Sequence, residues 1–368
     1  MFNEIKKNFG FGCMRLPMNK DKVNYEEFTE MVDYFIESGF NYFDTAHGYL
    51  DGESEIALKK CLTSRYERDK YILANKLSDF CFNKQEDIRP FFESQLEICG
   101  VDYFDFYLMH AQNADNYKKY KACKAYETAF ELKKEGKIKH VALSFHDKAT
   151  VLEQILTDYP QIEAVQIQFN YVDYEDASVE GRKVYEVCRK YKKPIIIMEP
   201  VKGGSLVNLP QNAQNIFNQL KGGSNASYAI RYAAGFEGVF MVLSGMGNMD
   251  MMRDNLSYMK DFKPLNDNEH EAIEKVCAIL KGQDIIPCTD CKYCVAGCPK
   301  KIAIPDLFAC LNGKKNFKNW NTDYYYSVHT QNGGKASDCI ECGLCEKACP
   351  QHLEIRKLLK EVAKEFDK

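Results

Sequence analysis

The sequence predicts a (β/α)8 barrel over residues 1–282, followed by a smaller, mainly helical domain over residues 283–368. Two observations lead to this fold class. Up to about Gly282, short apolar runs alternate with amphipathic stretches, and their number and spacing match a barrel of eight strand–helix units. After Gly282 this alternation ends, and two runs of closely spaced cysteines follow. A chain of 368 residues is too long for one ordinary core but suits one large domain and one small domain.

The candidate strands share an apolar character along nearly their whole length, as expected for strands that are buried on both faces. They are residues 9–14, 40–46, 71–77, 104–110, 138–145, 164–170, 194–200 and 238–246. Helical patterns lie between them, at residues 24–39, 87–100, 117–136, 148–159, 178–192 and 249–260. Asn24 is a suitable N-cap, and Gly39 and Gly136 stand where glycine commonly ends a helix. A doubly wound sheet is the alternative, although no G-x-G-x-x-G follows the first strand.

The C-terminal domain contains two copies of the pattern C-x2-C-x2-C-x3-C-P. The first copy is Cys288, Cys291, Cys294 and Cys298, and the second is Cys339, Cys342, Cys345 and Cys349. Thiolates are soft ligands that suit iron–sulfur centres, and this pattern resembles the run that binds cubane clusters in bacterial ferredoxins. Zinc sites use two separated ligand pairs, and disulfides need an oxidising compartment, so both are weaker alternatives.

The ferredoxin resemblance implies two [4Fe-4S] clusters, in which the fourth cysteine of each run binds the cluster of the other run. One cluster would then have Cys288, Cys291, Cys294 and Cys349 as ligands, and the other would have Cys339, Cys342, Cys345 and Cys298. The insert between the runs, which contains Trp320, is long for a compact ferredoxin and suggests one or two intervening helices. Residues 352–368 are expected to form a terminal helix, with Leu353, Ile355 and Leu359 on its apolar face.

Composition narrows the range of partners and compartments. The net charge is −4 and no basic run is present, which argues against nucleic acid and anionic membranes as partners. No apolar stretch is long enough for a membrane span, and residues 1–10 do not form the apolar core of a signal peptide. Sixteen cysteines without an export signal indicate a reducing cytoplasm. The eight cysteines outside the two runs have no ligand spacing and are expected to be buried: Cys13, Cys61, Cys81, Cys99, Cys123, Cys188, Cys277 and Cys310.

Polar side chains follow the apolar residues of three successive candidate strands. Asp44 stands near the end of the second strand and Tyr49 follows it. Lys76 stands near the end of the third strand, and His110 ends the fourth. The active site of a (β/α)8 barrel lies at this edge, so these side chains are expected to share one mouth. Their order resembles the catalytic tetrad of the aldo-keto reductases, as do the motifs at residues 12–17, 43–46, 52–55 and 101–110.

The resemblance implies a carbonyl reductase in which Tyr49 donates a proton to the carbonyl oxygen. A free tyrosine has a pKa near ~10, and the Lys76 ammonium, held by Asp44, is expected to lower it. His110 would donate a hydrogen bond to the same oxygen. The alternative is a polar cluster that closes the barrel mouth without any function.

The same resemblance implies a nicotinamide nucleotide, NADPH or NADH, in the barrel. The matching positions are Met14, Arg15, Ser144, Gln166, Met198, Gly203, Gly204, Ser244, Gly245 and Asn255. Phe145 stands where the family usually has asparagine, and Met198 stands where it often has an aromatic residue. The positions at which the family binds a 2′-phosphate with a basic residue are Gly245 and Met251 here, and neither is charged. These departures leave NADPH preference open.

Nicotinamide transfers two electrons as a hydride, whereas an iron–sulfur cluster passes one electron. A flavin accepts electrons singly and delivers them in pairs, so FMN in place of the nicotinamide nucleotide is a further hypothesis. The principal expectation is therefore an iron–sulfur oxidoreductase acting on a small carbonyl or alcohol, with ferredoxin or another carrier as a possible electron partner. The alternatives are an electron-transfer protein whose tetrad is not used for carbonyl reduction, and a sensor or structural module. Substrate and oligomeric state are not indicated by the sequence.

Overall fold

The structure is a computed structural model that describes residues 2–177, 179–220, 222–282, 286, 288, 292–317, 321–349 and 353–368. Eight parallel strands form a closed barrel in the order β1-β10-β9-β8-β7-β6-β5-β4. They are β1 (Phe9–Gly12), β4 (Tyr42–Asp44), β5 (Ile72–Leu77), β6 (Phe104–Gln112), β7 (Ile138–Phe145), β8 (Ala164–Gln168), β9 (Ile195–Met198) and β10 (Val239–Ser244). Each of these eight strands overlaps one expected from the sequence. The (β/α)8 barrel is confirmed, and the doubly wound alternative is wrong.

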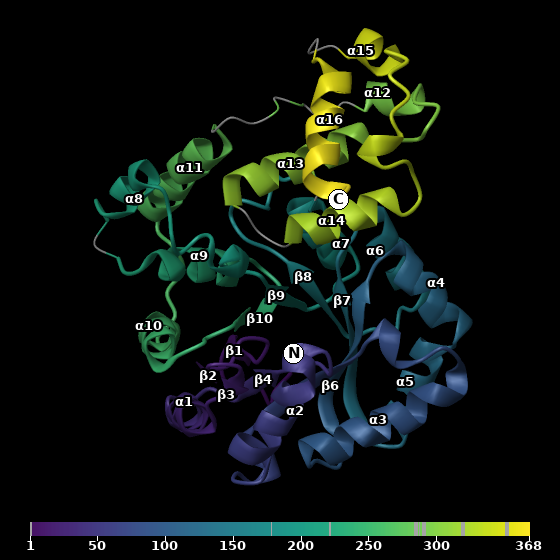
Figure 1. Ribbon diagram of the computed structural model, residues 1–368. Coiled ribbons are helices and arrows are strands. Elements are labelled where there is room, and N and C mark those ends of the chain that lie inside the picture. The colour runs from purple at the N-terminus through teal and green to yellow at the C-terminus, as the bar shows by residue number, and fades with distance from the viewer. Residues whose placement is uncertain are drawn as a thin grey trace.

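Helices surround this barrel, and most of them bury one face in its core (Figure 1). The helices at Gln211–Phe217 and Asp267–Lys281 instead pack in a separate apolar cluster. They are α1 (Tyr25–Glu37), α2 (Glu53–Leu58), α3 (Gln85–Cys99), α4 (Ala114–Ala122), α5 (Ala125–Lys134), α6 (Ala149–Asp158), α7 (Gly181–Lys190), α8 (Gln211–Phe217), α9 (Asn225–Ala234), α10 (Met249–Met259) and α11 (Asp267–Lys281). A short hairpin of β2 (Met18–Asn19) and β3 (Lys22–Val23) precedes α1. The Asn24 side chain accepts a hydrogen bond from the Glu27 amide at 3.3 Å, so the expected N-cap is present.

Two parts of the helical pattern differ from expectation. Residues 117–136 form two helices rather than one, because Lys124 adopts a left-handed conformation (φ 52°) between α4 and α5. Asn113 starts the first of these by accepting hydrogen bonds from the Asp115 and Asn116 amides. The sequence pattern assigned no helix to α2, which follows β4, or to α8, α9 and α11, which lie between and after the last two strands.

The C-terminal domain is helical and has a core of its own. It comprises α12 (Tyr293–Ala296), α13 (Ile304–Phe317), α14 (Asn321–Thr330), α15 (Leu344–Ala348) and α16 (Ile355–Phe366). The two helices α13 and α14 separate the cysteine runs, as the long insert predicted. Ile355 and Leu359 of α16 are buried as expected, whereas Leu353 is only partly buried. Cys291, Trp320 and His352 lie outside the described residues.

Several contacts fix this domain against the barrel edge at which the parallel strands end (Figure 1). The Tyr325 hydroxyl lies 3.0 Å from Gln168 Oε1 at the end of β8, and Lys148 forms an ion pair with Asp306. Val179 from the barrel packs within the apolar core of the C-terminal domain. The domain therefore lies over the barrel edge where an active site is expected. Within the described residues, no helix has both the length and the apolar character needed to cross a bilayer.

Candidate active site and cysteine sites

Asp44, Tyr49, Lys76 and His110 converge at the C-terminal edge of the barrel. Lys76 Nζ lies 2.6 Å from Asp44 Oδ1 and donates a second hydrogen bond to the carbonyl of Thr45 at 2.8 Å. The same ammonium lies 4.9 Å from the centroid of the Tyr49 ring. The centroids of the Tyr49 and His110 rings are 6.1 Å apart. Because β4, β5 and β6 are parallel neighbours, their ends bring these side chains together.

The loop that carries Tyr49 is held in an unusual conformation. Leu50, Asp51 and Gly52 all have positive φ, at 52°, 53° and 91°. Backbone strain of this kind persists where the surroundings fix it, and it is frequent at functional sites. The fully buried Glu55, in the helix after this loop, accepts hydrogen bonds at Oε1 from Asn75 and Gln95, and its Oε2 lies 2.8 Å from Nδ1 of His47, which precedes the loop. Glu55 belongs to one of the motifs that carry the family resemblance.

The charges of the four side chains follow from burial and from their neighbours. Burial acts to lower the pKa of Lys76, but Asp44 and Tyr49 outweigh it and raise the pKa, so the side chain is an ammonium. Burial raises the pKa of Tyr49, and the Lys76 ammonium only partly opposes this rise. Lys76 thus acts on this pKa in the expected direction, but loss of solvation is the larger effect and the pKa is raised overall. Burial, together with the positive charge of Lys76, lowers the pKa of His110 well below its usual value.

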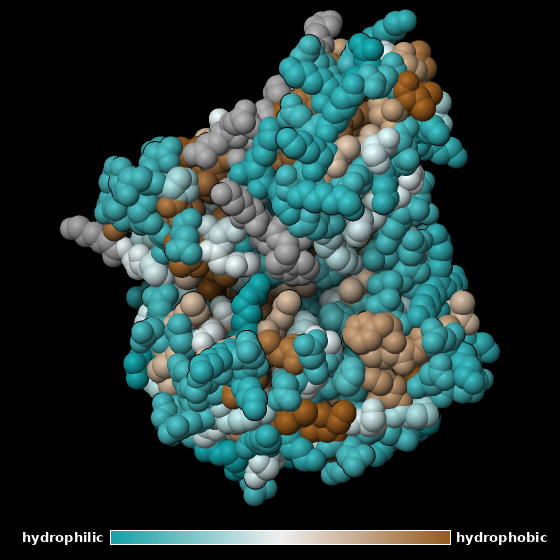
Figure 2. Space-filling view, viewed as in Figure 1, coloured by the Kyte–Doolittle hydropathy of each residue, from teal (hydrophilic) through white to brown (hydrophobic). Residues whose placement is uncertain are grey.

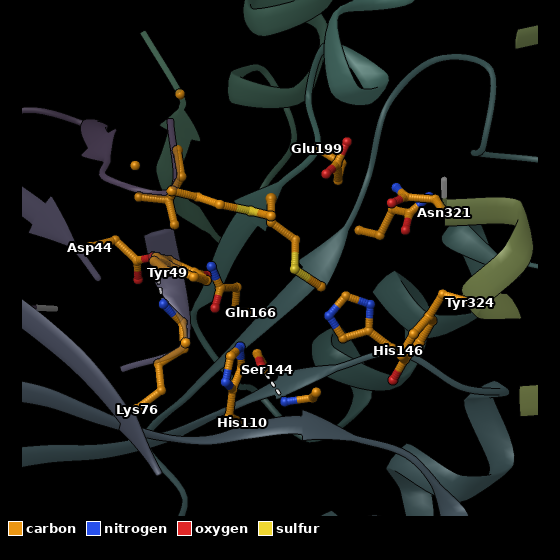
Figure 3. A pocket seen from close by; sticks show the side chains of 18 of the residues that line it. Asp44, Tyr49, Lys76, His110, Ser144, His146, Gln166, Glu199, Asn321 and Tyr324 are labelled. Carbon is orange, nitrogen blue, oxygen red and sulfur yellow. Dashed lines mark hydrogen bonds and ion pairs between the residues drawn. The ribbon is translucent and has the colours of Figure 1, made fainter. Parts of the chain in front are cut away.

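The four side chains open into a cavity of about 350 Å³, shown in Figure 3. The residues around it come from all eight barrel strands or their following loops and from α14 of the C-terminal domain. Besides the tetrad they are Gly12, Met14, Arg15, Gly48, Phe80, Ala111, Ser144, His146, Gln166, Gln168, Met198, Glu199, Leu243, Gly245, Asn321, Tyr324 and Tyr325. In Figure 3, Asp44, Tyr49 and Lys76 lie on one side of the cavity, and His146, Asn321 and Tyr324 lie on the other.

Six of the ten positions predicted to bind a nucleotide line this cavity: Met14, Arg15, Ser144, Gln166, Met198 and Gly245. Gln166 is buried, and its Oε1 has no hydrogen-bond partner, so it can accept a bond from an amide group of a ligand. Ser144 Oγ lies 2.8 Å from the Ala111 amide, which donates to it. These polar groups beside the tetrad fit the carboxamide of a nicotinamide ring.

The four remaining positions, Gly203, Gly204, Ser244 and Asn255, do not line the cavity. Asn255 Nδ2 donates to Ser244 Oγ at 2.8 Å, and Asn255 Oδ1 accepts from Tyr258 at 2.6 Å. The amide expected to contact adenine is thus buried and occupied within the protein. The residues present therefore fit the nicotinamide end of the nucleotide and do not fit its adenine end in this arrangement.

Two charged side chains near the expected diphosphate position are notable. Lys202 is buried and pairs with the fully buried Asp173, which also accepts hydrogen bonds from Gln168 and Asn170. Glu199 lines the cavity, its Oε2 is buried without a hydrogen-bond partner, and burial raises the pKa of this carboxyl. Arg15 lies beside Gly245, and the positive charges of Arg15 and Lys202 partly oppose this rise in the pKa of Glu199.

The thiols predicted to hold one cluster lie around a single small cavity. Cys298, Cys339, Cys342 and Cys345 line it together with apolar side chains that include Ile302 and Leu359. No three Cys, His, Asp or Glu side chains among the described residues come close enough for a single metal ion. A [4Fe-4S] cluster instead takes four thiolates around a larger body, so this set fits such a group.

The other predicted ligand set is only partly described, because Cys291 lies outside the described residues. Cys294 and Cys349 are buried in the apolar core of the C-terminal domain, and Cys288 packs against that core. Cys345 belongs to the same core. Both sets of thiols are therefore embedded in one packed unit, which also includes Tyr325 at the wall of the active-site cavity.

Sequence reasoning missed several residues that line the cavity. His146 follows two positions after Ser144, and Glu199 directly follows Met198, so their places at strand ends were the available signal. Gln168 stands two positions after Gln166 and had the same signal, whereas Phe80 had none. Asn321, Tyr324 and Tyr325 belong to α14, and their contact with the barrel depends on how the two domains pack, which no local pattern in the sequence encodes.

Comparisons with known proteins agree with this fold. The family model described as "Aldo/keto reductase family" matches residues 8–278, and the model described as "4Fe-4S dicluster domain" matches residues 287–354. The chain is 27% identical over 230 residues to "Probable aldo-keto reductase 1" of Glycine max, covering 57% of this chain and 62% of that protein. It is 28% identical over 195 residues to "NADH-specific methylglyoxal reductase" of Escherichia coli, covering 48% of this chain and 57% of that protein. The chain thus spans about 60% of the length of these curated relatives.

Solved structures show the same barrel. An aldo-keto reductase from Klebsiella pneumoniae in complex with NADPH superposes with a TM-score of 0.60 at 17% identity, covering 73% of this chain and 90% of that chain. An aldo/keto reductase from Brucella melitensis gives a TM-score of 0.57 at 20% identity, covering 73% and 94%. With the family model extending over most of the chain, this protein belongs to the aldo/keto reductase family and carries a 4Fe-4S dicluster domain on the C-terminal side of its barrel.

Proposed function

We propose that this protein reduces the carbonyl group of a small compound, or oxidises the corresponding alcohol, in the cavity above Tyr49. The observation that carries the proposal is the meeting of a tyrosine, a charged buried lysine and a neutral histidine at one end of the cavity, beside the unpartnered Gln166 Oε1. A nicotinamide nucleotide, held by Ser144 and Gln166, would supply or accept the hydride.

The roles of the side chains follow from their surroundings. Tyr49 donates its proton to the carbonyl oxygen, and the Lys76 ammonium stabilises the phenolate that remains. His110 Nδ1 lies 2.7 Å from Ser78 Oγ. When Nδ1 accepts a hydrogen bond from this hydroxyl, the hydrogen of the neutral ring is on Nε2. His110 then donates a hydrogen bond to the same oxygen as negative charge develops on it. Steady-state turnover of small aldehydes and ketones by anaerobically purified protein, with NADH or NADPH, tests this proposal.

A second candidate is an electron-transfer protein whose barrel holds FMN. The observation in its favour is the misfit of the adenine end, since FMN has one phosphate and no adenine, while Asn255 and Ser244 already bond to each other. A flavin links one-electron and two-electron chemistry, which would connect the clusters to the cavity. Absorption spectra and chromatography of the acid-released cofactors distinguish the candidates: flavin in the extract supports the second, and its absence together with nicotinamide binding supports the first.

The cofactor site also predicts a weak preference between NADPH and NADH. Met251 and Gly245 carry no charge, and Arg253 is exposed, with its guanidinium 3.6 Å from Asp250. Without a planar cation aimed at a 2′-phosphate, the Kd values of the two nucleotides are expected to differ by less than about tenfold. Fluorescence titration of the anaerobic protein measures both constants, with Arg253→Ala as the control that leaves them unchanged. NADPH binding a hundredfold tighter, lost in Arg253→Ala, would contradict the prediction.

A further inference from the structure

The surface over the second cysteine run exposes apolar side chains. Ile340 and Leu344 are 57% and 47% exposed, and no other large apolar residue described beyond residue 286 is as exposed as these. Both line the cavity formed by the four thiols, and Cys342 itself is exposed. In Figure 2, brown side chains gather at the upper right of the view, in the region of α12 and α15. The predicted cluster site therefore reaches the surface beneath an apolar patch.

Positive charge exceeds negative charge around this patch, although the chain as a whole has a net charge of −4. The two charged residues that line the thiol cavity, Lys300 and Arg356, are both basic. The three segments that form the site, residues 298–304, 335–347 and 353–361, contain seven basic and five acidic residues. The basic residues are Lys300, Lys301, Lys335, Lys347, Arg356, Lys357 and Lys360, and the acidic ones are Asp338, Glu341, Glu346, Glu354 and Glu361. Arg356 pairs with Glu346, Lys357 with Glu354 and Lys360 with Glu341. The other four lysines, Lys300, Lys301, Lys335 and Lys347, form no ion pair with any described residue.

We propose that this face docks an acidic one-electron carrier protein, so that electrons reach the cluster held by Cys298, Cys339, Cys342 and Cys345. The inference rests on the proposed redox role of that cluster. One electron leaves the carrier, which is oxidised, and enters the cluster, which is reduced, and no bond forms or breaks. An apolar centre with a charged rim is the usual anatomy of a protein interface, and electron-transfer complexes are small. Unpaired lysines would steer an acidic carrier toward Ile340 and Leu344.

Stopped-flow reduction of the clusters tests this face without any carbonyl substrate. The probe is a reduced plant-type [2Fe-2S] ferredoxin of net negative charge, and the signal is the loss of cluster absorbance. A Lys300→Glu, Lys347→Glu double variant is expected to lower the second-order rate constant about tenfold or more and to flatten its dependence on salt. Reduction by dithionite and the iron content should stay unchanged. The matched control is Lys192→Glu, at the opposite end of the barrel.

Several results would overturn the proposal. One is an equal rate constant in the double variant and the parent protein, and another is an equal loss in Lys192→Glu. If the charge changes remove iron, Ile340→Ser is measured instead, with a lower rate constant expected at unchanged dithionite reduction. A dimer in sedimentation that Ile340→Ser dissociates would assign the patch to self-association. Absence of carbonyl turnover alongside normal reduction by the carrier would count against the proposed carbonyl chemistry and leave this docking face supported.

A separate observation concerns the far side of the active-site cavity, which α14 provides. The Tyr324 hydroxyl accepts a hydrogen bond from Asn113 Nδ2 at 3.3 Å, and its ring lies edge-on to His146 with centroids 5.3 Å apart. Tyr325, next to it, is buried and bonds to Gln168. Contacts with the barrel therefore fix Tyr324 in the cavity wall, as Figure 3 shows.

This side of the cavity offers neutral hydrogen-bonding groups. Burial lowers the pKa of His146 to about 4, so its imidazole is uncharged at neutral pH. Burial also raises the pKa of Tyr324, which keeps its phenol protonated. We infer that Tyr324 is a specificity-determining residue that hydrogen-bonds a second, uncharged oxygen group of the substrate. The substrate class is then a small carbonyl compound with a further hydroxyl or carbonyl group, an inference that rests on the proposed carbonyl chemistry.

Hydroxyacetone and butanone test this inference, because they have similar size and only the first carries a hydroxyl group. The parent protein is expected to prefer hydroxyacetone in kcat/KM, and Tyr324→Phe should reduce that preference about tenfold, mainly through KM. Tyr326→Phe is the matched control, since its hydroxyl bonds to Asp367 away from the cavity. An unchanged preference in Tyr324→Phe would overturn the assignment while leaving the carbonyl chemistry in place. No turnover of any carbonyl compound by the parent protein would remove both.

Discussion

Replacing Tyr49 with phenylalanine is expected to lower kcat for carbonyl reduction by about 10²–10⁴-fold, the usual contribution of a positioned general acid. The variant retains the ring that lies between Lys76 and His110, at 4.9 Å from the ammonium and 6.1 Å from the imidazole centroid. The Kd of the nicotinamide nucleotide should not change, because Ser144 and Gln166 are untouched. Steady-state kinetics and a fluorescence titration of the same preparation measure the two quantities separately.

The pH dependence gives this experiment a second readout. Burial raises the pKa of Tyr49 above its ordinary value of 10.0, so the protonated acid persists further into the alkaline range. Since reduction uses the protonated form, kcat for reduction should stay level through neutral pH and fall as the pH rises through this pKa. Alcohol oxidation needs the phenolate and should rise over the same interval. Both transitions should be absent from the residual activity of Tyr49→Phe.

The control variant is Tyr66→Phe, which removes a hydroxyl that bonds to Asp33 away from the cavity. Its kcat should match that of the parent protein. Lys76 is a poorer choice for this test, because its removal would leave Asp44 buried and unpaired, at a cost of about 3–5 kcal/mol in folding stability. Unchanged turnover in Tyr49→Phe, with carbonyl reduction intact, would exclude Tyr49 as the proton donor.

The tetrad illustrates what the sequence can predict. Parallel strands in a barrel end at one edge, so polar residues at the ends of β4, β5 and β6 had to meet once those strands were recognised. The overall rise of the Tyr49 pKa was not predicted, because the lysine that lowers it is visible in the sequence and the burial that outweighs the lysine is not. Likewise, no glycine or proline marks the break between α4 and α5 at Lys124, so the sequence predicted one helix where the structure has two.

Contacts between the domains were beyond the reach of sequence patterns. Asn113 and Tyr324 are separated by 211 positions, and their hydrogen bond depends on the packing of α14 over the barrel edge. The position of His146 directly after β7 indicated that it could line the barrel mouth. Nothing in the sequence indicated that its ring would contact Tyr324. Asn255 shows the opposite case: its position matched the family pattern, yet its amide bonds to Ser244 and Tyr258 rather than facing a ligand cavity.

Replacing Cys345 with alanine is expected to remove one cluster and leave the other, so iron falls from about eight to about four atoms per chain. Cys345 lines the small cavity with Cys298, Cys339 and Cys342, and a cluster there loses one of its four thiolates in the variant. Cys310→Ala is a matched control, because Cys310 is fully buried in the same core but belongs to neither run. Iron and acid-labile sulfide should remain at parent levels in that control.

Exchange of ligands between the two runs makes the test sharper. Cys298 is the last cysteine of the first run, yet it lines the cavity of the second run. Cys298→Ala and Cys345→Ala should therefore lose the same species in the electron paramagnetic resonance spectrum of the reduced protein. Cys294→Ala and Cys349→Ala should lose the other. If Cys298→Ala instead shares its loss with Cys294→Ala, each run holds its own cluster and the exchanged assignment is wrong. An unchanged iron content in Cys345→Ala, or an equal loss of iron in Cys310→Ala, would show that these thiols are not the ligands. Electrons would then have no route from the surface at Ile340 and Leu344 toward the cavity that Tyr325 lines.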